Sequence, residues 1–211
     1  MTRILIADDH TIVRKGLKQI LSEGMKNVEF GESSNASETL PLIASKKFDI
    51  LILDLSMPGR SGLDLLKDIK VRFPKLPILV LSMYPEDQYA LRVVKAGAMG
   101  YLTKNSAPEE LVSAVTKILK GGRYISSVLS EQLLTMVQET NKGEGYGSLS
   151  DREFQVLQYI ASGKSVSDIA NALSLSVKTV STYRTRILEK LHLSSNAELT
   201  RYAMQNKIVD L

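Results

Sequence analysis

The 211-residue sequence contains no cysteine and no tryptophan, and only two histidines, His10 and His192. Without cysteine the chain has no disulfides, no thiolate zinc sites and no thiol nucleophile. Two histidines are too few for a histidine-based metal cluster. Any metal site that this chain forms must therefore use oxygen ligands.

Long apolar runs are also missing, because none approaches the roughly 20 residues that a membrane-spanning helix needs. The first residues enter a strand-like segment directly at Arg3–Ile6, which leaves no room for a signal peptide. We therefore expect a cytoplasmic protein that has no membrane partner.

The charge balance indicates nucleic acid only weakly. The formal net charge is +4 and the isoelectric point is near 9.1. Residues 1–124 hold 18 Lys and Arg against 14 Asp and Glu, whereas residues 125–211 hold 9 of each. A nucleic-acid surface in the second part must therefore come from local clustering of basic residues.

Strand-like and helix-compatible segments alternate over the first part of the chain. The strand-like segments are Ile4–Ala7, Val28–Phe30, Ile50–Leu53, Ile78–Leu81 and Gly100–Leu102. The helices are expected to begin near Thr11, Ala36, Gly62, Glu86 and Ala107. Short connections in this alternation predict a flavodoxin-like α/β domain over residues 1–122, with a five-stranded, doubly wound parallel sheet.

Polar residues stand at the carboxyl ends of the predicted strands. Asp8 and Asp9 follow the first, Asp54 follows the third, Ser82 the fourth and Lys104 the fifth. These ends meet at one edge of a doubly wound sheet. Clustered acids tolerate one another around a hard cation such as Mg²⁺, while the lysine and the hydroxyl suit phosphoryl oxygens.

Taken singly, these residues have ordinary structural explanations. Asp54 could cap the turn after it, Lys104 could be a solvated loop lysine, Ser82 a strand-end hydroxyl and Tyr101 a core aromatic. Together the strand ends favour a functional site, because the structural explanation must account for each end independently. For His10 we expect only a helix-entry position, without chemistry.

Residues 1 to about 122 resemble the receiver domain of two-component response regulators. The motifs in receiver order and spacing are Ala7-Asp8-Asp9-His10, Leu53-Asp54 with Met57-Pro58 and Gly62, Leu81-Ser82, Ala96-Gly97-Ala98 and Gly100-Tyr101-Leu102-Thr103-Lys104. The resemblance implies that a sensor histidine kinase phosphorylates Asp54. Mg²⁺ would be held by Asp8, Asp9, Asp54 and the backbone carbonyl of Ser56.

The same resemblance assigns roles to three further residues. Lys104 would stabilise the phosphoryl group, Ser82 would move towards it, and Tyr101 would be the aromatic switch residue. Apart from autocatalytic transfer to Asp54 and hydrolysis of the product, we expect no enzymatic activity.

Residues 123–148 are predicted to connect two domains. Apolar residues recur at helical spacing over Ile125–Val137, which predicts one more helix. Three glycines among polar residues over Gln138–Ser148 predict a flexible linker.

Residues 149–211 show helical patterns only. Ser150 and Glu153 form a capping-box signature ahead of an apolar helix. A short helix over Ser165–Leu173, a turn and a third helix of about 15 residues give the layout of a helix-turn-helix, and Ser194–Met204 predicts a fourth helix. We therefore expect an all-α domain.

The third helix has two contrasting faces. The residues predicted to pack inward are Val177, Val180, Tyr183, Ile187, Leu188 and Leu191. The opposite face carries Lys178, Ser181, Thr182, Thr185 and Arg186. From Val177 to Leu191 the formal charge is +3, which supplies the local clustering that the neutral total conceals.

Residues 149 to about 205 resemble the LuxR-type output domain of the NarL/FixJ family. The matching motifs are Leu149-Ser150-Asp151-Arg152-Glu153, Val156-Leu157, Ala161-Ser162-Gly163, Ile169-Ala170, Leu173, Ser176-Val177-Lys178-Thr179-Val180, Ile187, Lys190-Leu191 and Ala197-Glu198. The resemblance implies binding to double-stranded promoter DNA. By position we assign Lys178, Thr179, Arg184 and Arg186 to phosphates, and Ser181, Thr182 and Thr185 to base edges.

These features predict a response regulator that dimerises on phosphorylation and binds two DNA half-sites, with RNA polymerase as a further partner. One alternative is an Asp-nucleophile phosphohydrolase, although Ser56 stands where such an enzyme would have a second carboxylate. The other is a constitutive DNA-binding protein whose receiver only dimerises; its affinity for DNA would not respond to a phosphodonor.

Overall fold

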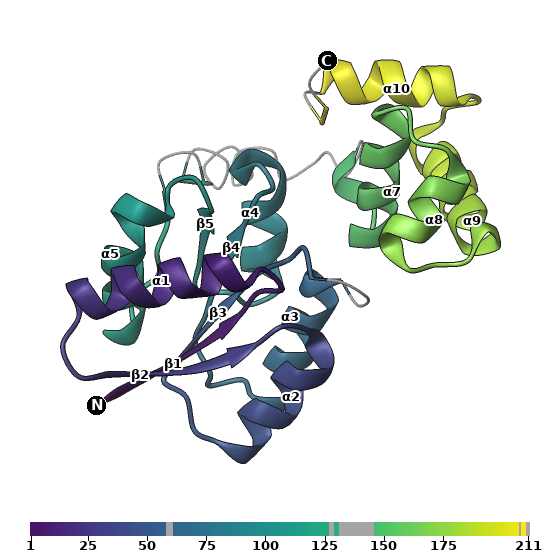
Figure 1. Cartoon of the computed structure of the whole chain (residues 1–211). Coiled ribbons are helices and arrows are strands. Elements are labelled where there is room, and N and C mark those ends of the chain that lie inside the picture. The colour runs from purple at the N-terminus through teal and green to yellow at the C-terminus, as the bar shows by residue number, and fades with distance from the viewer. Residues whose placement is uncertain (58–60, 127–128, 131–145, 207, 210–211) are drawn as a thin grey trace. The chain divides into compact units, whose positions relative to one another are not determined.

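The structure is a computed structural model of the chain and describes residues 1–57, 61–126, 129–130, 146–206 and 208–209. The chain divides into two compact units, an N-terminal unit over Met1–Gln138 and a C-terminal unit over Glu139–Leu211 (Figure 1). Among the described residues, no helix is both long and apolar enough to cross a membrane.

The N-terminal unit is a parallel sheet of five strands with order β2-β1-β3-β4-β5. The strands are β1 (Thr2–Ala7), β2 (Val28–Ser33), β3 (Ile50–Leu53), β4 (Ile78–Ser82) and β5 (Gly100–Thr103). The helices between and after them are α1 (Thr11–Gly24), α2 (Ala36–Ser45), α3 (Gly62–Arg72), α4 (Glu86–Lys95) and α5 (Ala107–Leu119). This confirms the predicted doubly wound fold, and all five helices begin at the predicted residues.

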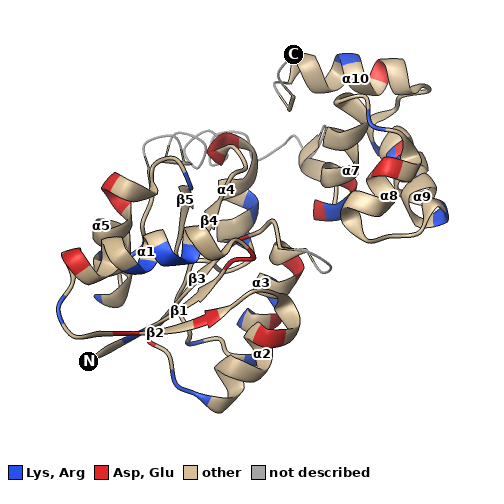
Figure 2. Ribbon diagram, viewed as in Figure 1, with Lys and Arg blue, Asp and Glu red and all other residues tan. Residues whose placement is uncertain are grey.

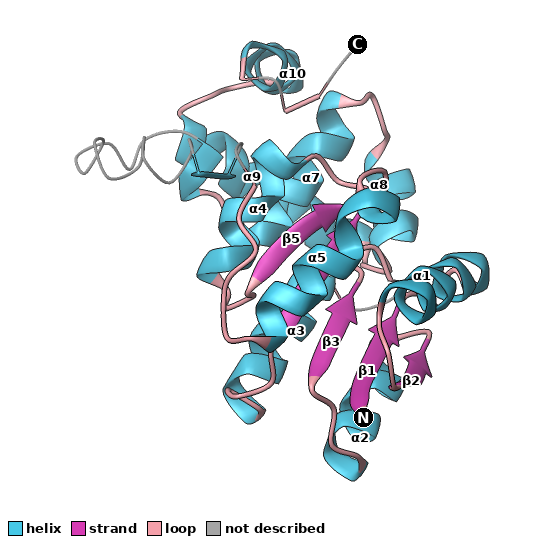
Figure 3. Ribbon diagram, turned by 90° about the vertical axis from the view of Figure 1, so that its left-hand side faces the viewer, coloured by secondary structure: helices cyan, strands magenta, loops and turns pink. Residues whose placement is uncertain are grey.

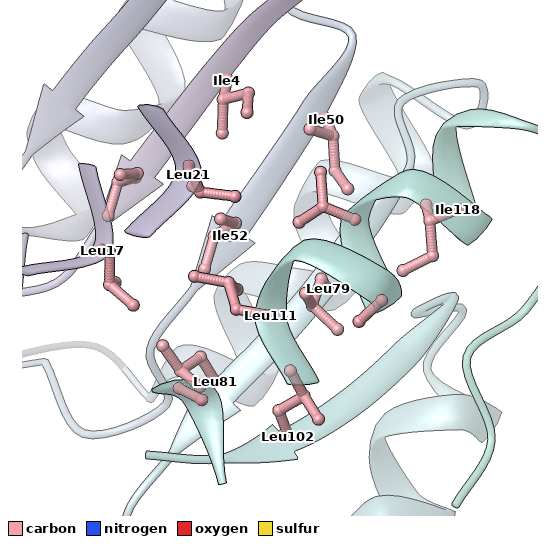
Figure 4. Close-up of a cluster of buried hydrophobic side chains, with 14 residues drawn as sticks. Ile4, Leu17, Leu21, Ile50, Ile52, Leu79, Leu81, Leu102, Leu111 and Ile118 are labelled. Carbon is pink, nitrogen blue, oxygen red and sulfur yellow. The ribbon is translucent and has the colours of Figure 1, made fainter. Parts of the chain in front are cut away.

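Helices cover both faces of the sheet, with α1 and α5 on one face and α2, α3 and α4 on the other (Figures 1 and 3). Beneath α1 and α5, isoleucines and leucines from four strands form one apolar cluster (Figure 4). Every residue of β3 is buried, as expected for a central strand of a parallel sheet. The sheet is therefore a rigid frame that holds in register the residues directly after its strands.

The chain beyond α5 returns to the sheet. Tyr124 pairs with Gly100 in a parallel bridge, and its N–H donates to the carbonyl of Met99 at 2.8 Å. The Tyr124 hydroxyl contacts Glu110 of α5, and the Ser126 hydroxyl contacts a carboxylate at the start of α4. Residues 123–126, which the sequence assigns to the connection, thus lie against the free edge of β5.

Most of the predicted connection cannot be compared with the structure. The predicted helix over Ile125–Val137 and the predicted linker over Gln138–Ser148 fall mainly outside the described residues. At the end of that linker, Tyr146–Ser148 forms the 3₁₀ turn η1. The Tyr146 N–H donates to the Tyr202 hydroxyl at 2.8 Å, so this turn packs as part of the C-terminal unit.

The C-terminal unit contains the helices α7 (Asp151–Ala161), α8 (Val166–Leu173), α9 (Val177–Leu191) and α10 (Asn196–Gln205). A serine caps each of them, because Ser150, Ser165, Ser176 and Ser195 each accept an N–H from the first turn of the adjoining helix. Between α8 and α9, Ser174 adopts the left-handed conformation with φ of 53°. The four predicted helices and the helix-turn-helix layout are confirmed.

An ion pair, between the buried carboxylate of Glu153 and the exposed Lys190, joins α7 to α9. The Lys190 ammonium lies 2.6 Å from the Glu153 carboxylate, which also accepts the N–H of Ser150 at 2.7 Å. Burial alone would raise the pKa of Glu153, but hydrogen bonds from Lys190 and Ser150 outweigh it and hold the pKa below its usual value of 4.5. The capping box therefore also positions the third helix of the unit.

Because the folded-state pKa of Glu153 is lowered, its contribution to stability is present above pH 4.5 and is lost as the pH falls through the folded-state pKa. Glu153→Gln should reduce protection from hydrogen exchange in α7 and α9 by about 1 kcal/mol near neutral pH. The loss should shrink towards about pH 4. The control is Glu189→Gln, which changes an exposed acid of α9. Equal losses of protection in both variants, or a loss in Glu153→Gln that does not depend on pH, would contradict this account.

Candidate functional site

Parallel register places two carboxylates side by side at the carboxyl edge of the sheet. Ala7 pairs with Leu53, so that Asp8 and Asp54 are the next residues of neighbouring strands. The Asp54 N–H donates to the carbonyl of Ala7 at 2.8 Å. Asp54 is only 1% exposed and Asp8 only 2%. Two buried acids therefore leave the sheet together, as the strand-end argument predicts.

Lys104 neutralises part of this charge. Its N–H continues the ladder after β5 by donating to the carbonyl of Ser82 at 2.8 Å, and its ammonium lies 2.8 Å from Asp54 Oδ2 and 2.7 Å from Asp8 Oδ2. Burial alone would lower the pKa of Lys104, but the two carboxylates outweigh that effect and raise it. The lysine is thus held as a cation between the two acids.

Both oxygens of the Asp54 carboxylate accept hydrogen bonds. Burial raises the pKa of Asp54, and this effect exceeds the opposing contributions of Lys104 and of the Ser56 N–H, which donates to Asp54 Oδ1 at 3.0 Å. Each carboxylate oxygen therefore has one donor. The predicted role of the Ser56 carbonyl as a metal ligand stays a prediction.

The residues around Asp54 fit a hard divalent cation. Ligand atoms of Asp8, Asp9, His10 and Asp54 all lie within 4.8 Å of one another. Three carboxylates against one ammonium leave a net negative charge, which suits Mg²⁺ and its preference for few protein oxygens. His10 stands at the helix entry, as predicted, as the N-cap residue of α1. Its Nδ1 also lies 2.8 Å from Asp9 Oδ1, so its side chain contacts the acidic cluster.

The start of α3 approaches the backbone of Asp54 and Leu55 closely. At Gly62, the first residue of α3, a Cβ atom would lie 2.4 Å from the Cα of Leu55 and 2.7 Å from the carbonyl oxygen of Asp54. Any side chain here would displace one of the two segments. The glycine therefore lets the start of α3 pack directly against the backbone of Asp54 and Leu55.

Ser82 and Tyr101 lie together, beside the loop that leads into α4. The buried Ser82 hydroxyl accepts the N–H of Tyr84 at 3.3 Å. The Tyr101 hydroxyl donates to the carbonyl of Tyr84 at 2.8 Å, and burial raises the pKa of Tyr101 above its usual range. Tyr84 in turn stacks on Tyr89 of α4 with ring centroids 4.4 Å apart. Ser82 and Tyr101 thus both contact the backbone of Tyr84, in the loop between β4 and α4.

On α9 of the C-terminal unit, five residues of the predicted outward face are exposed: Lys178, Ser181, Thr182, Thr185 and Arg186. An open hollow of about 300 Å³ on this helix is lined by Lys178, Thr179, Thr182, Tyr183 and Arg186. Two cations, two hydroxyls and a phenol around one hollow provide charge and donors for a phosphate group.

Other residues of α9 are used within the unit. The Arg184 guanidinium donates to Asn196 Oδ1 at 2.5 Å, at the start of α10. Thr179 Oγ1 lies 2.8 Å from the capping hydroxyl of Ser176. Their predicted phosphate contacts stay predictions. Because Lys190 is paired with Glu153, less free positive charge remains on the helix than the formal sum of +3 indicates.

One predicted core residue of α9 is wrong. Val177 is 51% exposed, whereas Val180 and Ile187 are fully buried. Val177 is the first residue of the helix. Helical side chains lean towards the N-terminus, so a residue of the first turn reaches past the elements that pack on the rest of that face.

Residues 4–116 match the family described as the response regulator receiver domain. Residues 147–203 match the family described as bacterial regulatory proteins of the luxR family. This chain is a NarL/FixJ-type response regulator.

Two known response regulators and one solved structure align with this chain over nearly its full length. It is 36% identical over 209 residues to UvrY of Escherichia coli, covering 98% of this chain and 95% of UvrY. It is 37% identical over 213 residues to GacA of Pseudomonas aeruginosa, covering 100% of this chain and 99% of GacA. Among solved structures, RcsB from Salmonella enterica serovar Typhimurium, bound to promoter rprA in the presence of the phosphomimetic BeF3⁻, matches this chain with a TM-score of 0.67 at 32% identity. The match covers 95% of this chain and 97% of the RcsB chain.

Three residues that contact the acidic cluster, Tyr101 or α9 are not predicted from the sequence. Arg14 of α1 contacts the acidic loop, Tyr84 receives the hydroxyl of the predicted switch tyrosine, and Asn196 holds Arg184. Each acts through a backbone atom or across a helix boundary. No spacing in the sequence marks such contacts, although the polar Asn196 two residues after Ser194 lies where a helix start is expected.

Removing Lys104 should leave two buried carboxylates without their cation. Lys104→Met should destabilise the metal-free receiver by about 3 kcal/mol near neutral pH. Since the folded-state pKa of Asp54 is already raised and would rise further, the destabilisation should grow with pH above the usual Asp value of 3.8 and be smaller at about pH 5.

Urea denaturation in the presence of a chelator measures this effect. Adding Asp54→Asn to Lys104→Met should recover part of the lost stability, and the exposed Lys15→Met is the matched control. The same loss at both pH values would contradict the electrostatic explanation.

Proposed function

We propose that a sensor histidine kinase phosphorylates Asp54 and that the phosphorylated protein binds promoter DNA as a dimer. The observation that carries this proposal is the buried contact of Lys104 with Asp54 and Asp8, at 2.8 and 2.7 Å. It supplies an acceptor carboxylate and a cation at one point on a rigid sheet. We further propose a cytoplasmic location, with RNA polymerase as a later partner.

In the transfer, an Asp54 carboxylate oxygen attacks the phosphorus of a phosphohistidine. A new O–P bond forms, the N–P bond breaks, and the histidine nitrogen keeps the electron pair. Lys104 can follow the charge onto a phosphoryl oxygen because it already lies 2.8 Å from Asp54 Oδ2. Bound Mg²⁺, held by Asp8, Asp9, Asp54 and the Ser56 carbonyl, would supply further neutralisation of the phosphoryl charge.

The Ser82 hydroxyl offers a route from this site to the rest of the receiver. A phosphoryl oxygen would accept a hydrogen bond from the Ser82 hydroxyl and draw it towards Asp54, whereas the oxygen of that hydroxyl now accepts the Tyr84 N–H at 3.3 Å. The Tyr101 hydroxyl rests on the carbonyl of the same Tyr84. A shift of Ser82 would therefore bias both the loop and the tyrosine, which is the logic of a phosphorylation switch.

The C-terminal unit would place α9 in the major groove. The exposed Lys178 and Arg186 would contact phosphates, while Thr182 would face bases. The Thr182 hydroxyl already donates to the Lys178 carbonyl at 3.0 Å, so it would accept a hydrogen bond from a base amino group. Solved relatives include an RcsB–DNA complex and RcsB dimers bound to DNA, which supports the same arrangement for this chain.

DNA affinity with and without a small-molecule phosphodonor tests the proposal. DNA sites selected with the full-length protein should bind the phosphorylated wild type about 10-fold more tightly, and Asp54→Asn should show no such response. Equal wild-type affinities in both states would favour the constitutive DNA-binding protein. Multiple turnover of a phosphoester, instead of one phosphoryl group per chain, would favour the phosphohydrolase.

Two substitutions on α9 should separate phosphate contacts from base contacts. Lys178→Ala should weaken binding to all sequences and reduce the salt dependence by about one charge. Thr182→Ala should leave the salt dependence unchanged and relax base preference. Binding measured on selected and scrambled DNA over a range of salt concentrations distinguishes them, and equal, sequence-independent losses for both would refute this division.

A further inference from the structure

We propose that Arg14 is a positioning residue that fixes the Asp8–Asp9 peptide and so holds both acids in the geometry that binds Mg²⁺. This inference rests on the proposed function, because it concerns the metal site of the phosphorylation reaction. Arg14 lies on α1, outside the acidic cluster, and its side chain is only 13% exposed.

The guanidinium of Arg14 forms a three-way clamp. Its Nη1 donates to the backbone carbonyl of Asp8 at 2.7 Å, its Nη2 to Thr11 Oγ1 at 3.3 Å, and its Nε to Glu32 Oε2 at 3.0 Å. The first two contacts lie on either side of the acidic loop, and the third lies on β2. One planar group therefore ties the loop to a strand of the sheet.

The carbonyl of Asp8 matters because it belongs to the peptide that leads to Asp9. The peptide unit is planar, so the direction of the Asp8 carbonyl sets the direction in which the chain reaches Asp9. Among the described residues, none of the other contacts of Asp8 involves this carbonyl: its N–H donates to Ser33, and its carboxylate accepts the His10 N–H and pairs with Lys104. Arg14 is what holds the carbonyl itself.

Glu32 anchors the clamp on β2. Its carboxylate contacts both Arg14 and Lys18, and hydrogen bonds from these two cations, that from Lys18 first, hold the pKa of Glu32 below its usual range. Figure 2 shows the basic stretch of α1 and the acidic positions of β2 on neighbouring elements. Glu32 thus remains a carboxylate, and the Arg14 side chain stays directed at the loop.

The positive charge of Arg14 and its positioning role would change Mg²⁺ affinity in opposite directions. As a nearby positive charge it should repel a divalent cation, so its removal would strengthen Mg²⁺ binding. As a positioning group it should strengthen binding, because loss of an outer contact of a metal ligand typically weakens affinity 10- to 100-fold. Arg14→Lys separates the two effects, since it keeps the charge and removes the planar fork.

The test is a Mg²⁺ titration of the full-length protein, followed by the amide NMR signals of Asp8, Asp9 and His10. Arg14→Lys should bind Mg²⁺ about 10-fold more weakly than the wild type. Without Mg²⁺, its Asp9 amide signal should already be shifted. Glu32→Gln, which keeps Arg14 but weakens its anchor, should show a smaller loss in the same direction.

The matched control is Arg3→Lys. Arg3 and Glu29 form a similar pair between β1 and β2, with Nε 3.0 Å from Oε2, but they lie at the other end of these strands. This variant should bind Mg²⁺ like the wild type. If Arg14→Lys does not fold, Glu32→Gln alone decides the matter.

Unchanged or tighter Mg²⁺ binding by Arg14→Lys, or by Glu32→Gln where only that variant folds, would overturn the positioning role while leaving the proposed function intact. Equal weakening by Arg3→Lys would overturn it as well, because the effect would then be a general loss of stability. A wild type whose amide signals do not respond to Mg²⁺ would overturn the proposed function together with this inference.

Discussion

The contact of Lys104 with Asp54 and Asp8 is the constraint on which the site depends. Two nearly fully buried acids cannot both stay ionised at one sheet edge without a cation unless the fold loses stability, because burial without a partner costs several kcal/mol per charge. One ammonium does not balance them once Asp9 is included. The residual negative charge suits a divalent cation, and in the proposed reaction the shared lysine would stabilise the phosphoryl group.

The rest of the receiver holds this contact in place. Strand register brings Asp8 and Asp54 together. The hydrogen bond from the Lys104 N–H to the Ser82 carbonyl, just after β5, positions Lys104 beside them. Gly62 lets α3 pack directly against the backbone of Asp54 and Leu55, and Arg14 ties the acidic loop to the sheet. In the C-terminal unit, serine caps start the helices, and the ion pair of Lys190 with the buried Glu153 joins α9 to α7.

The sequence predicts whatever repeats with a period or stands at the end of an element. Strand and helix positions, the convergence of Asp8, Asp54 and Lys104, and the outward face of α9 all come from such patterns. It does not predict contacts set by tertiary packing: Val177 has the correct phase for the core yet extends beyond the residues that would cover it, and Lys190 pairs with Glu153 instead of adding to the surface charge. Arg14 is missed because its partner is a backbone carbonyl, which every residue carries.

The central claim is that Asp54 accepts one phosphoryl group, and the most direct test is the intact mass of the full-length protein after incubation with Mg²⁺ and a small-molecule phosphodonor. The account predicts a single phosphoryl adduct on the wild type that a peptide map assigns to Asp54, and no adduct on Asp54→Asn. The same adduct on both proteins, or none on the wild type, would contradict it and leave the buried contact with Lys104 as a purely structural ion pair.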